Sequence, residues 1–581
     1  MMTSLHRIPA VALLACALAL VACGGATVDR FPTSGPMLLD PDTAHVDDMP
    51  REYWSGLMAD GFDQIAMYPF SRFFEMDPAG PSVNVNAYDE VPDSSWFENR
   101  IGYGGFSLED AARGACPEDR LDPDRGPWTI VAAKPNGANP GFIILDPEGR
   151  GWLMKFDGRT LSDERATSAD VIGSRIYHAV GYHSPCNVIV YFDRDTLVLS
   201  EDAETEDEFG NDVPMTDADI DDVLAAAVRT DDGRFRGSAS LFLEGRPIGP
   251  FTYQGVRRDD PNDAFEHSDR RDLRGARVLA AWLNHFDARE QNSLTMWHED
   301  DDGHTWVKHY YLDFGDCFGS RWADDAMTRR FGFSYYFHFA HVFADWLSLG
   351  LVSRPWHTVE VNDVAPLFNY FDVEHFEPER WRSGYRNPAF RRMQDDDGAW
   401  MARILAMLTE DHLRVMIGEA RMSNPVESEE LFAILWGRRE RVLDHYLRVR
   451  SPLAHPTIDG DTLCFTDLGA LNGIWSPDTV RYRASMIAGA DAATVWERDV
   501  NHPERQGPRV CLPLTTDDGA GLAGDGATDL DRYGIVAIET VDEAGPNPLP
   551  PILLHVVDHD EHWQLVGVER PADRPEIDRI R

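Results

Sequence analysis

The segment from Trp128 to about residue 200 constrains the fold most, because short strands and one helix follow each other there without long gaps. Three strand-like runs come first, WTIVAA, FIILD and WLMKFD, separated by the glycine-containing loop KPNGANPG and the turn PEGRG. A helix is predicted in LSDERATSADVIGSRIYHAVGYHSP, where Ala169, Ile172 and Ile176 fall on one face. The runs NVIVYFD and TLVLSE add two strands. This order predicts a β-rich lobe that contains one helix.

The first residues, MMTSLHRIPAVALLACALALVACGG, have the make-up of an export signal. The basic start is weak, and the apolar run after it is shorter than the roughly 20 residues that a membrane-spanning helix needs. The sequence Leu20-Val21-Ala22-Cys23 resembles the lipobox of bacterial lipoproteins, in which the cysteine is acylated and the preceding bond is cut. We therefore expect residues 1–22 to be a signal peptide and Cys23 to carry lipid. An ordinary signal peptide with a free cysteine is the alternative.

The residue after the predicted lipid site bears on location. Gly24 stands where an aspartate would be the usual signal for retention in the inner membrane. The resemblance therefore implies a lipid-anchored protein of the cell envelope, at the outer membrane and facing the periplasm or the exterior. The membrane would be a partner only through the N-terminal lipid.

Cysteine is sparse beyond the export signal. The remaining residues form an odd set that is not a disulfide framework: Cys116, Cys186, Cys317, Cys464 and Cys511. An oxidising compartment permits a bridge, and Cys464 and Cys511 share a strand-rich segment, so they are the best candidate pair.

The net charge narrows the class of partner. The chain has 54 basic and 99 acidic residues, which leaves a formal charge of −45. A surface this acidic does not bind nucleic acid through its phosphates, because that binding depends on positive side chains that release counterions. We expect no nucleic-acid partner.

Composition divides the chain into successive regions. Residues 23–125 are interpreted as a tether and a segment that wraps a neighbouring domain, and residues 126–200 as the β-rich lobe. Residues 201–452 begin with a charge run, EDAETEDEFGNDVPMTDADIDD, predicted to be a solvated loop, and continue as a helical, Trp-rich region. Residues 453–581 contain short alternating runs, including the hairpin-like ILLHVV-DHDEH-WQLVGVE, and are predicted to form a small β domain.

Four sequence elements whose side chains could take part in catalysis or binding occur in a fixed order along these regions. Lys155 lies on the third predicted strand, and the helix after it offers the carboxylates Glu164 and Asp170. The octet His285-Phe286-Asp287-Ala288-Arg289-Glu290-Gln291-Asn292 comes next, and Asp313-Phe314-Gly315 follows a later strand. The spacing H-x-D-x4-N, the D-F-G triplet and the strand lysine together resemble the protein-kinase-like superfamily.

The pattern looks closest to the atypical branch that contains HipA-type kinases and the spore-coat kinase CotH, within an uncharacterised group of bacterial lipoproteins. The resemblance covers roughly residues 128–450. It implies an α+β, two-lobed kinase-like fold, with a β-rich N-lobe and a helical C-lobe, followed by the C-terminal β domain.

The resemblance also implies how a nucleotide would be held. Lys155 would bind the α- and β-phosphates of ATP or another nucleotide, oriented by a helix carboxylate. Asp170 is favoured for that carboxylate, and Glu164 is the alternative. The backbone of the loop from Asn136 through Gly137 to Gly141 would cover the phosphates, although PNGANPG is not the usual G-x-G-x-x-G.

Catalysis would fall to residues in the later motifs. Asn292 and Asp313 would carry Mg²⁺ or Mn²⁺, since hard cations prefer oxygen ligands. Asp287 would accept the proton of a hydroxyl on a protein or small-molecule acceptor, and Arg289 would face the γ-phosphate. Phe286 replaces the usual Arg of H-R-D, so control by activation-loop phosphorylation is not expected.

Two other functions fit the same pattern. One is transfer of AMP on the same scaffold, and the other is a catalytically silent envelope scaffold or binding lipoprotein, that is, a pseudokinase. The sequence motifs do not distinguish between them.

Overall fold

The computed structural model describes residues 26–32, 44–47, 49–52, 67, 79–134, 139–158, 164–206, 211–319, 328–329, 332, 339–385, 387–500, 505–517, 519–522, 528–542, 548–559, 562–575 and 577–580. Mixed α and β structure divides between two compact units. The larger unit contains residues 39–85 and 91–447, and the smaller contains residues 1–38, 86–90 and 448–581. The predicted signal peptide and Cys23 lie outside the described residues.

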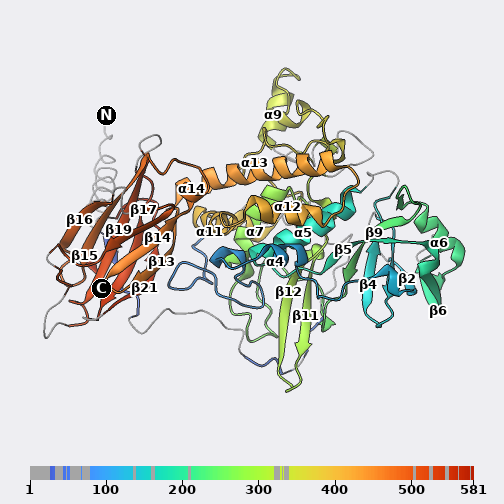
Figure 1. The fold of residues 1–581 in the computed structure, drawn as a ribbon, viewed down its shortest axis with the longest axis horizontal. Coiled ribbons are helices and arrows are strands. Elements are labelled where there is room, and N and C mark those ends of the chain that lie inside the picture. The colour runs from blue at the N-terminus through green and yellow to red at the C-terminus, as the bar shows by residue number, and fades with distance from the viewer. Residues whose placement is uncertain are drawn as a thin grey trace, which may run out of the picture. The chain divides into compact units, whose positions relative to one another are not determined.

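The larger unit contains an eight-stranded sheet built around the segment that opens the predicted β-rich lobe (Figure 1). Its strand order is β5-β9-β4-β3-β2-β6-β7, with β8 paired to β9. The strands are β2 (Trp128–Ala133), β3 (Gly141–Leu145), β4 (Gly151–Lys155), β5 (Asn187–Phe192), β6 (Leu197–Glu206), β7 (Asp212–Pro214), β8 (Val228–Arg229) and β9 (Phe235–Leu241). The five strands and the helix predicted between Trp128 and residue 200 are confirmed, the helix as α5 (Arg165–Val180).

Alternating burial explains why these strands form. Trp128, Ile130, Trp152 and Met154 are fully buried in one apolar cluster, and the residues between them are partly exposed. Strand β9 lies between β4 and β5, so the sheet extends past residue 200. Its sequence FRGSASL contains no β-branched residue, which is why strand propensity gave no sign of it.

The described part of the larger unit contains further helices besides α5. They are α4 (Leu108–Arg113), α6 (Asp217–Leu224), α7 (Arg271–Leu283), α9 (Phe339–Leu347), α10 (Pro388–Arg392), α11 (Asp395–Leu405), α12 (Glu410–Gly418) and α13 (Pro425–Val449). A three-stranded sheet accompanies them, in the order β10 (Arg246–Pro247), β11 (Ser293–Glu299) and β12 (Thr305–Tyr311). Helix α7 is buried along its length, and its Trp282 Nε1 donates to Leu435 O of α13 at 2.8 Å.

The predicted solvated loop over residues 201–222 is wrong. Strand β6 runs to Glu206, β7 covers Asp212–Pro214, and α6 begins at Asp217. The Thr216 amide donates to Asp219 at 2.7 Å at the start of α6. Most of the described acidic side chains in this segment are exposed, so the prediction of solvent exposure was correct. The charge pattern did not indicate that the backbone forms strands and a helix.

The regular structure in the described part of the smaller unit is almost entirely β. Its strands are β1 (Ala26–Val28), β13 (Leu453–Asp459), β14 (Thr462–Asp467), β15 (Val480–Ala488), β16 (Thr494–Val500), β17 (Arg505–Gln506), β18 (Arg509–Pro513), β19 (Tyr533–Asp542), β20 (Ile552–Asp558), β21 (Trp563–Glu569) and β22 (Ile577–Ile580), with one short helix, α14 (Leu468–Leu471). Five of them form the sheet β16-β15-β19-β20-β21, and β20 and β21 form the predicted hairpin. Strand β1 pairs with β22, so part of the predicted tether belongs to this unit.

Two disulfides cross-link the chain. Cys464 and Cys511 face each other on β14 and β18 and are bonded, which confirms the predicted pair. Cys116 and Cys186 form a second bond that the sequence did not indicate, and Cys317 is buried and free. Disulfides persist in oxidising compartments, so both bonds favour a location outside the cytoplasm. Within the described residues, no helix is long and apolar enough to cross a membrane.

Candidate active site

Three charged side chains from separate elements meet at the C-terminal end of β4, an interior strand of the eight-stranded sheet. Lys155 ends β4, Asp170 lies on α5, and Asp313 follows β12. The Lys155 Nζ is 3.0 Å from Asp313 Oδ1 and 3.4 Å from Asp170 Oδ2. Burial opposes the positive charge on Lys155, but the two carboxylates more than offset it and raise the pKa of Lys155 above its usual value.

Helix α5 holds the Asp313–Gly315 segment in place. The Phe314 amide donates to Asp170 Oδ1 at 3.2 Å, so Asp170 contacts both the lysine and this backbone. Arg165 Nη1 donates to Gly315 O at 3.1 Å. Gly173 leaves room for the ring of Phe314, because a Cβ there would lie 2.5 Å from Phe314 Cβ. Asp313 itself has φ +58°, which is uncommon for a residue with a side chain and directs its carboxylate beside Lys155.

Aromatic side chains pack against the same segment through Phe314. Phe314 is fully buried, and its ring centroid lies 4.7 Å from that of Tyr177 and 5.8 Å from that of His285. The Tyr177 hydroxyl and His285 Nδ1 are 2.8 Å apart. Burial lowers the pKa of His285 to about 4, so the ring is neutral at physiological pH and acts as a packing and hydrogen-bonding group.

The predicted catalytic loop brings three polar side chains together. Asn292 Nδ2 donates to Asp287 Oδ2 at 2.8 Å and to Asp287 O at 2.9 Å. Arg289 Nε lies 3.2 Å from Asp287 Oδ1, and its guanidinium stands 4.7 Å from the centre of the Tyr385 ring. Asp287 and Asn292 are both buried, whereas Arg289 is partly exposed.

The protonation of Asp287 is shifted by its surroundings. Burial raises the pKa of Asp287 to about 7, and the negative charges of Asp316 and Asp313 act in the same direction. The Arg289 charge and the Asn292 hydrogen bond oppose the rise without cancelling it. A carboxylate that changes charge near neutral pH suits proton transfer.

The donor set around Asp313 fits a hard divalent cation. The side chain of Asp313 is 52% exposed, so one carboxylate edge stays open although Lys155 contacts it. The amide nitrogen of Asn292 is used on Asp287, which leaves its oxygen as a candidate ligand. Within the described residues no three His, Cys, Asp or Glu side chains are grouped to hold a metal alone. Mg²⁺ in nucleotide sites takes one or two protein ligands and completes its shell with phosphate and water. Two candidate ligands, Asp313 and Asn292, are therefore enough for such a site.

Glu164 belongs to a different cluster. It is buried at the start of α5, where its Oε2 accepts from the Ser423 amide at 2.8 Å and its Oε1 lies 3.7 Å from Arg236 Nε. Of the two carboxylates considered for Lys155, the structure therefore brings Asp170 to the lysine and places Glu164 elsewhere.

The predicted phosphate loop is described in part. Asn136 and Gly137 lie outside the described residues, whereas Gly141 begins β3 and pairs with Lys155 on β4. Gly141 has no room for a side chain, since a Cβ would lie 2.0 Å from Met154 O and 3.3 Å from Lys134 Cδ. The glycine therefore lets the side chain of Lys134 pass close to the sheet on the face that carries Lys155.

Lys134 is the residue of this site that the motifs missed. Its burial lowers the pKa of Lys134, the charge of Lys155 acts in the same direction, and Asp313 and Asp170 oppose both. The sequence does hold one signal for it. Lysine occurs only at positions 134, 155 and 308, although Lys and Arg together number 54. Two of the three lysines thus lie together on one face of the sheet.

Comparison with known proteins gave matches to solved structures only. No protein-family model matches the chain, and no curated protein matches it in sequence. A crystal structure of the golgi casein kinase matches at 15% identity and a TM-score of 0.22, covering 49% of this chain and 73% of that one. The same kinase with Mn/ADP bound matches at 13% identity and a TM-score of 0.21, covering 48% and 74%. At these TM-scores the likeness does not by itself assign a fold or an activity to this chain.

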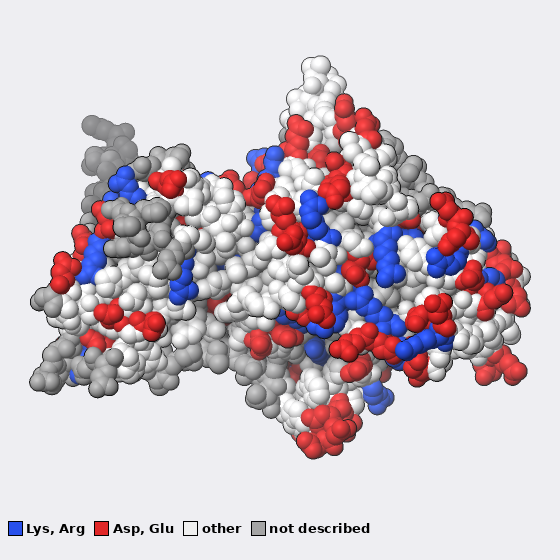
Figure 2. All heavy atoms as spheres, in the orientation of Figure 1, with Lys and Arg blue, Asp and Glu red and all other residues white. Residues whose placement is uncertain are grey.

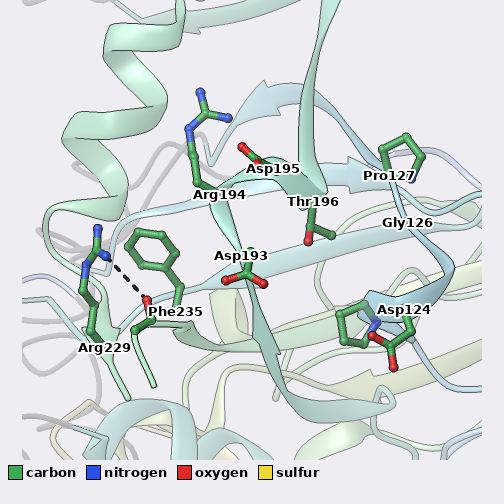
Figure 3. Close-up of a pocket in the computed structure, with 11 residues that line it drawn as sticks. Asp124, Gly126, Pro127, Asp193, Arg194, Asp195, Thr196, Arg229 and Phe235 are labelled. Carbon is green, nitrogen blue, oxygen red and sulfur yellow. Dashed lines mark hydrogen bonds between the residues drawn. The ribbon is translucent and has the colours of Figure 1, made fainter. Parts of the chain in front are cut away.

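A hollow on the surface of the larger unit lies apart from these residues. Its lining includes Asp124, Asp193, Arg194 and Arg229, and none of the candidate residues contributes to it (Figure 3). Arg194 is already paired with Asp217 at 2.8 Å and Asp221 at 3.1 Å. The Arg229 guanidinium lies 4.2 Å from the centre of the Phe235 ring, so both arginines of the hollow already have contacts within the chain.

Proposed function

We propose that this chain is an exported, lipid-anchored protein with a kinase-like catalytic site that transfers a phosphoryl group from Mg·ATP to a hydroxyl of a protein or small molecule. The contact of Lys155 Nζ with Asp170 at 3.4 Å and Asp313 at 3.0 Å carries the proposal. Lys155 and Asp313 come from motifs 158 residues apart. Phosphoryl transfer needs a phosphate-binding lysine and a cation-binding carboxylate close together, and neither motif alone determines that distance.

Each side chain has a task in this proposal. Lys155, held by Asp170, binds the phosphates of the nucleotide, and Lys134 adds a second positive charge on the same sheet face. Asp313 and the Asn292 oxygen hold the cation, which when bound neutralises phosphate charge.

The proton of the acceptor goes to Asp287. Its raised pKa lets the carboxylate take up a proton near neutral pH, and Asn292 and Arg289 fix its orientation through contacts of 2.8 Å and 3.2 Å. Arg289 is partly exposed and packed over Tyr385, so its guanidinium can meet the transferring group while Asp287 receives the proton.

Phosphoryl transfer is tested by incubating purified residues 24–581 with Mg²⁺ and γ-labelled ATP, with and without candidate acceptor proteins. We expect label on the chain or an acceptor, and at least a hundredfold less with Asp313→Ala, because catalytic-site charge of this kind is worth several kcal/mol. Asp195→Ala, an exposed carboxylate outside the site, is the matched control and should label normally. Equal labelling by the wild-type chain and Asp313→Ala would contradict the proposal.

A change of label and a thermal unfolding measurement separate the other two functions. Label from α-labelled but not γ-labelled ATP would indicate AMP transfer. Failure of every nucleotide to raise the unfolding temperature in Mg²⁺ or Mn²⁺ would favour a silent scaffold.

Lipid anchoring is supported by the lipobox-like sequence at Cys23, and export is supported by the two disulfides. We expect cells fed labelled palmitate to label the wild-type chain and to lose that label in Cys23→Ser. A wild-type chain without label, recovered in the soluble fraction, would contradict it.

A further inference from the structure

Helix α9 and the turn after it present an unusually apolar surface. We call this surface the apolar tip, and it consists of Phe343, Trp346, Leu347, Leu349, Leu351 and Val352. Leu349 is 93% exposed and Leu351 is 90% exposed. Single exposed apolar residues need no explanation, but six within ten positions mark a binding surface.

The tip is an ordered structure with a packed side and an open side. Val342, on the inner face of α9, packs against a buried cluster of Trp356, Val359 and Tyr370. The turn is held by hydrogen bonds from Gly350 N to Asp345 O at 2.9 Å and from Val352 N to Ser348 Oγ at 2.9 Å. The leucines are therefore presented outward by a defined turn and are not left over from incomplete packing.

Charge distinguishes the tip from the rest of the chain. Between positions 339 and 353, Asp345 is the only acidic residue, and no Lys or Arg occurs. Asp345 Oδ2 is paired with Arg354 Nε at 2.8 Å, so the tip has no net charge in a chain whose formal charge is −45. Figure 2 shows the end of this projection, where Figure 1 places α9, as mostly uncharged, with acidic groups further back.

We propose that the apolar tip inserts into the interface of a lipid bilayer. Trp, Phe and Leu on a short amphipathic segment are the side chains that enter the boundary between headgroups and acyl chains. The nine-tenths exposure of both Leu349 and Leu351 on one turn makes a convex surface, which a deformable bilayer accommodates. The proposal rests on the proposed function in one respect, which is that the Cys23 lipid keeps the chain at a membrane. The tip would then be a second, reversible attachment.

Vesicle binding of the unacylated chain tests the insertion directly. Purified residues 24–581, which lack both the signal peptide and Cys23, are floated with vesicles of phosphatidylethanolamine and phosphatidylglycerol. We expect binding that falls at least tenfold in Leu349→Ser/Leu351→Ser. The double variant Val198→Ser/Val426→Ser removes two apolar side chains elsewhere that are about half exposed, at 46% and 53%, and should bind like the parent. Because the assay uses neither lipid attachment nor nucleotide, its outcome is independent of the palmitate and ATP experiments.

A local probe separates insertion from other causes. Leu349→Cys in residues 24–581, labelled with a polarity-sensitive dye, should shift its emission to the blue on vesicle addition, whereas a dye at Leu471→Cys should not. Equal vesicle binding by the tip variant, or no shift at position 349, would overturn the proposal. So would concentration-dependent dimerisation that the tip variant abolishes, since a second copy of the chain would then be the partner. Unchanged unfolding temperatures would show that all variants fold.

Discussion

The charge of Lys155 is maintained in a mostly buried position by two carboxylates of different exposure. Asp170 is almost fully buried and serves the lysine and the Phe314 amide, whereas Asp313 is half-exposed and can serve a ligand as well. At this position an Asp can pair with the lysine, although the helix carboxylate of typical kinases is a longer Glu. Position 170 on α5 is close enough to Lys155, and Glu164 is occupied by Ser423 and Arg236.

Lys134 predicts a measurable effect on nucleotide affinity. Its side chain shares a sheet face with Lys155, so replacing it removes one of two positive charges there. We expect Lys134→Ala to weaken ATP binding about tenfold, or about 1.4 kcal/mol, with a smaller change in kcat. Titration calorimetry with Mg·ATP measures this, and Lys308→Ala, the remaining lysine, is the control. Equal affinity of Lys134→Ala and wild type would remove Lys134 from the site.

Asp287 predicts the pH dependence of transfer. Since the pKa of Asp287 is about 7 and the base must be unprotonated, kcat/KM should rise with pH and level off above about 7. Asp316→Asn should move the midpoint down, because Asp316 raises this pKa, and Arg289→Gln should move it up, because Arg289 lowers it. Rates measured from about pH 5.5 to about pH 8.5 check both directions. Midpoints that do not move in opposite directions would exclude Asp287 as the base.

The same shift affects stability with a definite sign. The unfolded chain releases the Asp287 proton at its ordinary pKa of about 3.9, whereas the folded chain keeps it until about 7. Folding therefore binds a proton between these values. The contribution of this group to stability is full at lower pH and is lost as pH rises toward 7.

At the scale of elements, α5 is the part that assembles the site. One turn of it supplies Asp170 to Lys155 and Phe314, and the next turn supplies Gly173, against which the Phe314 side chain packs. The helix was predicted correctly from its apolar face, and Asp170 was favoured as the partner of Lys155, but the contact of the helix with Phe314 was not predicted. Its partner segment at Asp313–Gly315 is more than a hundred residues away along the chain.

Gly173 predicts a large effect from a small substitution. A Cβ at Gly173 would lie 2.5 Å from Phe314 Cβ, whereas a Cβ at Gly418, on α12, would meet no atom within 4 Å. We expect Gly173→Ala to reduce the free energy of unfolding by about 1–3 kcal/mol and to weaken Mg·ATP binding, through displacement of Asp313. Gly418→Ala should be neutral or slightly stabilising. Thermal unfolding of both variants tests this, and equal unfolding temperatures would contradict the close packing of α5 on Phe314.

At the scale of the whole molecule, each compact unit carries one disulfide. Cys116–Cys186 lies in the larger unit and closes a separation of 70 residues, and Cys464–Cys511 lies in the smaller unit and closes one of 47. A disulfide that closes a long loop stabilises the fold because it restricts the unfolded chain. We therefore expect both units to be more stable under oxidising conditions, where the bonds persist.

Reduction should therefore destabilise both units. We expect removal of either bond to cost about 2–5 kcal/mol, seen as lower unfolding temperatures in dithiothreitol. Cys464→Ser/Cys511→Ser should abolish only the share of this effect that belongs to the smaller unit. Cys317→Ala, which removes the free thiol, should keep the whole effect. Unfolding that does not respond to dithiothreitol would contradict the disulfide assignment.

The sequence by itself determined the local elements and the chemical types at the site. Periodicity indicated the strands around Lys155 and helix α5, and motif spacing indicated Asp287, Asn292 and Asp313, because both signals depend on neighbours along the chain. Only the tertiary structure decided which carboxylate meets Lys155, how Lys134 reaches the same face, where β9 enters the sheet, and that the apolar tip stays exposed. These outcomes depend on how segments far apart in the chain pack together, and local patterns such as periodicity and motif spacing do not reveal that packing.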